Sequence, residues 1–155
     1  MLFRSSDGKP VSRNVYWLST RADVLDWANS NWYLTPLTQY ADLTALHSLP
    51  AATSEVRATT RREGNDDVTT VTLSVPATST AVAMFQHVSI RRGAHGNLAL
   101  PIRWNDNDVT LWPGESMVLT ARYESQGTAD PVVEVSGWNV PAQSVPAPAT
   151  QGTDH

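Results

Sequence analysis

The strongest constraint on the fold is a strict two-residue alternation of apolar and hydroxyl side chains in the middle of the chain. In the run VTTVTLSV, Val71, Leu73 and Val75 fall on one face of an extended strand, and the threonine and serine residues between them fall on the other. Successive side chains of a strand point to opposite sides of a sheet. The pattern therefore predicts a strand with one buried and one solvent-facing side.

A partner strand is expected directly before this one. The segment Val56–Arg62 is also rich in β-branched side chains, and the polar stretch Glu63-Gly64-Asn65-Asp66-Asp67 separates it from Val68–Val75. A short polar link that contains glycine favours a β-hairpin.

Five more short strands follow at intervals of roughly 8–12 residues, with turn residues between them. Their expected ranges are Ala81–Arg91, Leu98–Trp104, Val109–Trp112, Ser116–Tyr123 and Val132–Val140. The apolar phase slips once after Phe85, which predicts a β-bulge. Pro101 indicates an interrupted or edge strand, and Pro113-Gly114 indicates a type II turn. Residues 51–140 are therefore expected to form an all-β, antiparallel β-sandwich.

The two ends of the chain differ from this middle part. Residues 1–50 are irregular, with a hairpin expected between residues 2–3 and 11–19 around Asp7-Gly8, and single helical turns expected at 23–27 and 38–46. Residues 141–155 consist largely of proline, alanine, serine and threonine. Such a segment has little apolar surface to bury, so we expect a disordered or extended tail.

Charge and cysteine content exclude several classes of function. The net charge of −4 argues against a nucleic-acid partner, which favours a basic surface. No apolar run approaches the roughly 20 residues that span a bilayer, so no membrane partner is expected. The chain has no cysteine, which excludes disulfides, thiolate nucleophiles and cysteine-based zinc sites.

Catalysis by this chain alone is not expected. Glycoside hydrolysis needs two carboxylates roughly 5–9.5 Å apart around a cleft. The acid pairs Asp66/Asp67 and Asp106/Asp108 fall at expected turns, where aspartate side chains bind nearby backbone. The four histidines are accompanied by no G-x-S-x-G or H-E-x-x-H motif. We therefore predict no catalytic residue, no metal site and no cofactor, with weak calcium binding by residues 105–108 as the alternative to a plain turn.

Aromatic side chains are concentrated in a polar stretch near the N-terminus. Trp27, Trp32 and Tyr33 lie within the sequence DWANSNWY. Flat aromatic faces pack against the C–H faces of sugar rings, and tryptophan and tyrosine add a hydrogen-bonding edge. The three residues are therefore candidate carbohydrate-binding residues. The competing interpretation is that they fasten an irregular linker to neighbouring domains.

Three longer strings resemble a known family. They are NVYWLS at 14–19, YADLTAL at 40–46 and WNDNDVTLWPGES at 104–116. Over about residues 2–140, the chain resembles the C-terminal region of the exo-β-D-glucosaminidases of glycoside hydrolase family 2, which are related to β-mannosidases and remove glucosamine from chitosan oligomers. The resemblance implies an immunoglobulin-like sandwich at 51–140, with residues 1–19 as the last hairpin of a preceding immunoglobulin-like domain and residues 20–50 as a linker.

The resemblance also implies a role. The catalytic carboxylates of that family lie on strands of a (β/α)₈ barrel, and no motif here matches them, so the chain looks like a non-catalytic C-terminal fragment of a secreted, extracellular enzyme. The implied partners are the catalytic barrel and the neighbouring domain, together with chitosan or glucosamine oligosaccharides. An isolated fragment with an uncovered interface is expected to self-associate. The alternative is an independent carbohydrate-binding module that uses Trp27, Trp32 and Tyr33.

Overall fold

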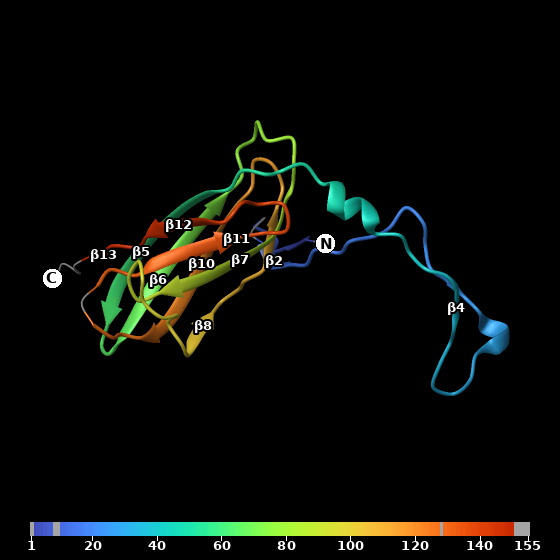
Figure 1. Cartoon of the computed structure of the whole chain (residues 1–155), viewed down its shortest axis with the longest axis horizontal. Coiled ribbons are helices and arrows are strands. Elements are labelled where there is room, and N and C mark those ends of the chain that lie inside the picture. Colours follow the sequence, from blue (N-terminus) through green and yellow to red (C-terminus); the bar gives the residue numbers. More distant parts are fainter. Residues whose placement is uncertain (1, 8–9, 128, 151–155) are drawn as a thin grey trace. The chain divides into compact units, whose positions relative to one another are not determined.

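The computed structural model describes residues 2–7, 10–127 and 129–150 (Figure 1). The chain divides into two compact units, residues 1–49 and residues 50–155. Nearly all regular structure in the described part is β-strand, and its two helical elements are short 3₁₀ turns.

Residues 50–150 form two facing sheets (Figure 1). The first sheet has the order β13-β5-β6-β10-β8, and the second has the order β12-β11-β7-β9. Neighbouring strands are antiparallel except β13, which runs parallel to β5. The expected all-β, immunoglobulin-like sandwich is thereby confirmed.

The strands of the first sheet are β5 (Glu55–Glu63), β6 (Asp66–Ser74), β8 (Ile102–Trp104), β10 (Ser116–Glu124) and β13 (Ala149–Thr150). Those of the second are β7 (Ala83–Arg91), β9 (Val109–Leu111), β11 (Val132–Ser136) and β12 (Gln143–Pro146).

The β5–β6 hairpin is tighter than its sequence suggested. Glu63 pairs with Asp66, so the turn is only Gly64-Asn65. Gly64 has φ +63°, a left-handed value that glycine adopts without steric cost. The predicted alternation on β6 is confirmed, because Val71, Leu73 and Val75 are buried.

The predicted bulge and type II turn are both present. The β7–β9 register shifts between Ala83 and Gln86, and Phe85 between them has φ +49°. At the turn, Gly114 has φ +82°, and the N–H of Glu115 donates to the carbonyl of Trp112 at 3.0 Å. β8, which follows Pro101, is an edge strand of its sheet, as expected.

The core lies between the two sheets and is mostly apolar, although it contains a chain of hydroxyl groups and Gln86 and Thr110 are also buried. Its buried side chains come from inward positions of both sheets and include Val71, Leu73, Leu119 and Ala121 of the first and Val88, Ile90, Leu111, Val133 and Val135 of the second. The hydroxyls of Thr60, Thr69 and Tyr123 form a buried chain with two contacts of 2.8 Å. Burial raises the pKa of the Tyr123 hydroxyl, so this group stays neutral and can hydrogen-bond to the threonine hydroxyls of the chain.

Within residues 143–150 the expected tail is extended and not disordered, and it forms two strands that its sequence did not predict. β12 pairs with β11, and β13 pairs with β5, so this segment covers an edge of each sheet. Ala147 between them is fully buried, and its N–H donates to the carbonyl of Pro131 at 2.8 Å. Composition missed these strands because they are held by backbone hydrogen bonds, which any residue but proline can donate. Residues 151–155 of the expected tail lie outside the described residues.

Residues 1–49 contain two small hairpins and two 3₁₀ turns. The strands are β1 (Leu2–Arg4), β2 (Pro10–Arg13), β3 (Val24–Leu25) and β4 (Leu37–Gln39), and the turns are η1 (Trp27–Asn29) and η2 (Thr44–Ser48). The hairpin around Asp7 is present, but its second strand ends at Arg13 and not at Ser19. The helical turns begin four and six residues later than expected, because short β3–β4 pairing occupies the first part of both segments.

One asparagine side chain connects three segments at one end of the sandwich. The Asn139 amide nitrogen donates to the carbonyls of Pro50 at 2.7 Å and Val82 at 2.8 Å. Its amide oxygen accepts from the N–H of Met84 at 2.9 Å. The segment that leads into the sandwich, the start of β7 and the loop after β11 therefore share a single side chain.

We expect Asn139→Ala to lower the free energy of unfolding by about 2–4 kcal/mol, because it leaves three backbone groups without their partner. The matched control is Asn97→Ala, at an exposed position, which should change the free energy of unfolding by less than about 0.5 kcal/mol. Urea unfolding of both variants measures this, and equal midpoints would contradict the role given to Asn139.

Candidate functional site

The aromatic segment at residues 27–34 is exposed along its whole length. Trp27 is 71% exposed, Trp32 is 93% exposed and Tyr33 is 71% exposed. None of the side chains described in residues 1–49 is buried. The three candidate residues therefore lie at the surface of a unit that has no core of its own.

Local hydrogen bonds give this segment a defined shape. Asp26 caps η1 by accepting from the N–H of Asn29 at 3.2 Å. The side-chain oxygen of Asn31 accepts from the N–H groups of Tyr33 and Leu34 at 3.1 and 3.0 Å. Aspartate and asparagine side chains favour such turns because they imitate a backbone carbonyl.

The base of the same segment is closed by contacts between residues far apart in sequence. The Ser19 hydroxyl donates to the carbonyl of Asp42 at 2.7 Å, and the N–H of Ala41 donates to the Asp23 carboxylate at 2.7 Å. Hydrogen bonds from the hydroxyl and N–H of Thr44 lower the pKa of Asp42. Residues 19–42 thus form a closed loop that presents its aromatic side chains outward.

The two adjacent rings of this segment do not form a flat platform. The centroids of Trp32 and Tyr33 are 4.9 Å apart and their planes cross at 70°, an edge-to-face arrangement. A sugar ring that stacks on Trp32 therefore meets the edge of Tyr33 and not its face. Such a pair fits an uneven protein surface better than a pyranose ring.

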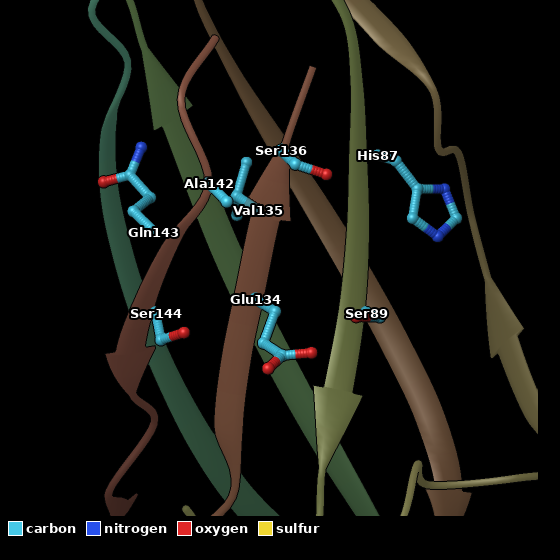
Figure 2. A pocket seen from close by; sticks show the side chains of 8 residues that line it. All are labelled: His87, Ser89, Glu134, Val135, Ser136, Ala142, Gln143 and Ser144. Carbon is cyan, nitrogen blue, oxygen red and sulfur yellow. The ribbon is translucent and has the colours of Figure 1, made fainter.

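A second feature is a polar groove on the outward face of the second sheet. It has a volume of about 350 Å³ and is lined by His87, Ser89, Glu134, Val135, Ser136, Ala142, Gln143 and Ser144. Figure 2 shows these side chains arising from β7, β11, β12 and, for Ala142, the residue directly before β12. From the sequence, only the strand positions could be identified here. The available signal was a pair of polar residues two positions apart in each of two expected strands, His87 and Ser89 in one and Glu134 and Ser136 in the other.

The rim of the groove is fixed by polar contacts from the turn that directly precedes β9. Nδ1 of His87 lies 2.9 Å from the carboxylate of Asp108. The Asn107 side chain bonds both the N–H and the carbonyl of Val88 at 2.8 Å, which replaces a strand partner along this part of β7. Asp106 accepts from the N–H of Asn107 at 2.8 Å, as expected of a turn residue.

Two acidic side chains of the β5–β6 hairpin are paired with arginine. Among the described residues, no three histidine or acidic side chains come together to hold a metal ion. Glu63 and Asp66 both contact the Arg122 guanidinium. Hydrogen bonds from Arg61 and Arg122 lower the pKa of Glu63. A general acid of a glycosidase needs the opposite shift.

No helix in the described part of the chain has the length and apolar character needed to cross a membrane.

Two facing, mainly antiparallel sheets with a buried apolar interlayer define an immunoglobulin-like β-sandwich domain. The chain belongs to a particular family of such domains: the model of the exo-beta-D-glucosaminidase Ig-fold domain matches residues 32–140. The resemblance drawn from the three sequence strings is thereby confirmed.

The similar proteins are much longer than this chain. The exo-beta-D-glucosaminidase of Streptomyces avermitilis is 45% identical over 152 residues, covering 95% of this chain and 16% of that protein. That of Amycolatopsis orientalis is 47% identical over 149 residues, covering 92% of this chain and 14% of that protein. The crystal structure of Amycolatopsis orientalis exo-chitosanase CsxA superposes with a TM-score of 0.82 at 41% identity, covering 93% of this chain and 17% of that chain. The chain therefore spans about a sixth of its relatives' length.

We expect the contribution of Glu63 to stability to depend on pH. A lowered folded-state pKa stabilises the fold above the ordinary glutamate pKa, and this contribution is lost as pH falls through the lowered value. Glu63→Gln should therefore destabilise the sandwich at pH 7, with the difference disappearing between about pH 5 and pH 2. Urea unfolding across this range measures the difference, and Glu55→Gln on the same strand is the control. A difference that grows toward low pH would contradict the assignment.

Proposed function

We propose that this chain is a non-catalytic accessory β-sandwich of a secreted exo-β-D-glucosaminidase that acts on chitosan oligosaccharides. Its role is to pack against the catalytic barrel and the neighbouring domain and to stabilise them. Family membership supports the enzyme class, and one similar structure is a complex of CsxA with PNP-beta-D-glucosamine. An extracellular location belongs to the proposal, because a polymeric substrate is met outside the cell.

The observation that carries the packing role is the exposure of large apolar side chains in residues 1–49. Exposed positions there include Tyr16, Leu18, Trp27, Trp32, Tyr33, Leu34 and Tyr40. Contiguous apolar surface of more than a few hundred Å² is rare on independent soluble domains and marks interaction sites. Burial stabilises by about 25 cal/mol per Å², so this surface favours contact with another domain. Under this proposal residues 1–19 complete a preceding immunoglobulin-like domain and residues 20–50 link it to the sandwich.

The closed loop at residues 19–42 supports the same role. Its hydrogen bonds at Ser19, Asp23, Asp26 and Asn31 hold the backbone before any partner binds. A surface that is already ordered loses less conformational entropy on binding, so more of the apolar burial appears as affinity. The loop is therefore suited to docking in a fixed orientation.

A second candidate function is carbohydrate binding by Trp27, Trp32 and Tyr33. The near-complete exposure of Trp32 within a polar loop favours it. The edge-to-face arrangement of Trp32 and Tyr33 favours the docking role instead.

We expect the isolated chain to self-associate through its uncovered aromatic surface. Sedimentation velocity over a concentration series should show a monomer–oligomer equilibrium. Replacing Trp27, Trp32 and Tyr33 together by serine should raise the dissociation constant about tenfold or more, because aromatic anchors dominate interface energies. Val118→Ser, at an exposed position on β10, is the matched control and should change little. A monomeric profile of the unaltered chain at high concentration would count against the proposal.

We further expect no sugar response from the aromatic loop and no hydrolysis. In a ¹⁵N NMR titration with the glucosamine trisaccharide, the indole signals of Trp27 and Trp32 should stay in place and the trisaccharide should keep its length. Shifts of those two signals that are abolished by Trp32→Ala would favour the carbohydrate-binding function. Shortening of the sugar by purified chain would contradict the non-catalytic role.

A further inference from the structure

We propose that the groove on the outward face of β12, β11 and β7 is an amino-sugar-binding site, separate from the aromatic loop. Its ligand is a short glucosamine oligosaccharide carrying protonated amines. This inference rests on the proposed function for its choice of sugar, but it concerns different residues and a different face.

Strand register places the central polar residues in one row. Glu134 on β11 lies directly opposite Ser144 on β12 and Ser89 on β7. Neighbouring strands are about 4.8 Å apart, so the row spans about 10 Å. The carboxylate of Glu134 is thus flanked on both sides by hydroxyl groups on the floor of the groove. Figure 2 shows Glu134 between Ser144 and Ser89.

A second row lies next to the first. Ser136 on β11 is opposite His87 on β7. Residues two positions apart on one strand share a face and are separated by about 7 Å. The two rows together offer hydroxyl, imidazole and carboxylate groups over an area that suits one or two sugar rings, in agreement with the groove volume of about 350 Å³.

Two exposed aromatic residues follow in the chain segments beyond the second row, Phe85 on β7 and Trp138 in the turn after β11. Phe85 precedes His87 by two residues and is 44% exposed, and Trp138 follows Ser136 by two residues and is 52% exposed. The N–H of Trp138 donates to the carbonyl of Met84 at 2.9 Å, which keeps the two chain segments adjacent. The face therefore combines polar groups with apolar ring surface, the combination that sugar rings require.

The polar groups of the groove retain hydrogen-bonding capacity. Nε of Arg91 and Oε1 of Glu134 form an ion pair at 2.8 Å. Within the described part of the chain, Oε2 of Glu134 has no protein partner. The hydroxyls of Ser89, Ser136 and Ser144 have none there either. These are acceptors and donors of the kind that an ammonium and ring hydroxyls use.

The amino sugar gains one contact that a neutral sugar lacks. Arg91 donates to the carbonyl of Gly96 at 3.3 Å, so its guanidinium is anchored beside Glu134 and pairs with Oε1. An ammonium at Oε2 forms a charge-assisted hydrogen bond, which is stronger than a neutral one. An N-acetylated sugar carries no charge at this position and gains only a neutral contact.

The test is a ¹⁵N NMR titration of the full 155-residue chain with the glucosamine trisaccharide and, separately, its N-acetylated counterpart. Binding should shift the backbone signals of Ser89, Glu134 and Ser136 and the indole signal of Trp138, with a dissociation constant in the millimolar range, about 1–10 mM. The N-acetylated sugar should bind at least about threefold more weakly.

Variants separate the groove from general surface effects. Glu134→Gln should weaken binding of the amino sugar about two- to fivefold and leave binding of the N-acetylated sugar unchanged. Ser136→Ile, which fills the groove, should abolish binding of both. The matched controls are Glu124→Gln and Ser116→Ile, at exposed positions on β10 of the other sheet, and both should bind normally.

Each outcome has one meaning. No shift at the groove signals up to about 20 mM trisaccharide would overturn the amino-sugar site and leave the accessory role intact. Equal responses to the two sugars, or an unaltered Glu134→Gln variant, would overturn the contact between the ammonium and Glu134. Shifts of the indole signals of Trp27 and Trp32, or shortening of the trisaccharide, would instead contradict the proposed function and would not bear on the groove site.

Discussion

Burial of one apolar face from each sheet is the interaction on which the described structure depends. Val71, Leu73 and Leu119 of the first sheet share the interlayer with residues of the second, such as Val133 and Val135, and all five are buried. Because successive side chains of a strand point to opposite faces, burial of one face of each sheet leaves the other face available to polar residues. The groove on β7, β11 and β12 is a consequence, since its polar side chains His87, Ser89, Glu134, Ser136 and Ser144 occupy outward positions of strands whose inward positions build the core.

Side-chain amides form hydrogen bonds with backbone groups where strands end or diverge and regular strand pairing stops. Asn139 connects three segments, Asn107 pairs with Val88, and Asn105 accepts from the N–H of Thr120 at 2.7 Å. Each of these amides reaches backbone groups that a regular strand would have satisfied. The bulge at Phe85 and the rim of the groove can therefore deviate from ideal pairing without leaving those groups unpaired.

The two units are stabilised by different means, which accounts for the different functions that we propose for them. The sandwich has an apolar interior and can present a preformed groove. Residues 1–49 have local hydrogen bonds but no buried side chain in the described part, so their large aromatic residues remain at the surface. Hydrogen bonds define the direction in which Trp27 and Trp32 point, whereas only contact with other apolar surface can remove them from water.

The sequence by itself determined the sandwich, because two-residue alternation, the bulge after Phe85 and the turn at Pro113-Gly114 depend on local geometry. It also determined the family through three short strings. Pairing between distant segments was decided only by the tertiary structure, because backbone hydrogen bonds leave no trace in composition: β12 and β13 could not be foreseen for this reason. The row of Ser144, Glu134 and Ser89 was equally hidden, since strand register, and not sequence spacing, sets which side chains lie opposite one another.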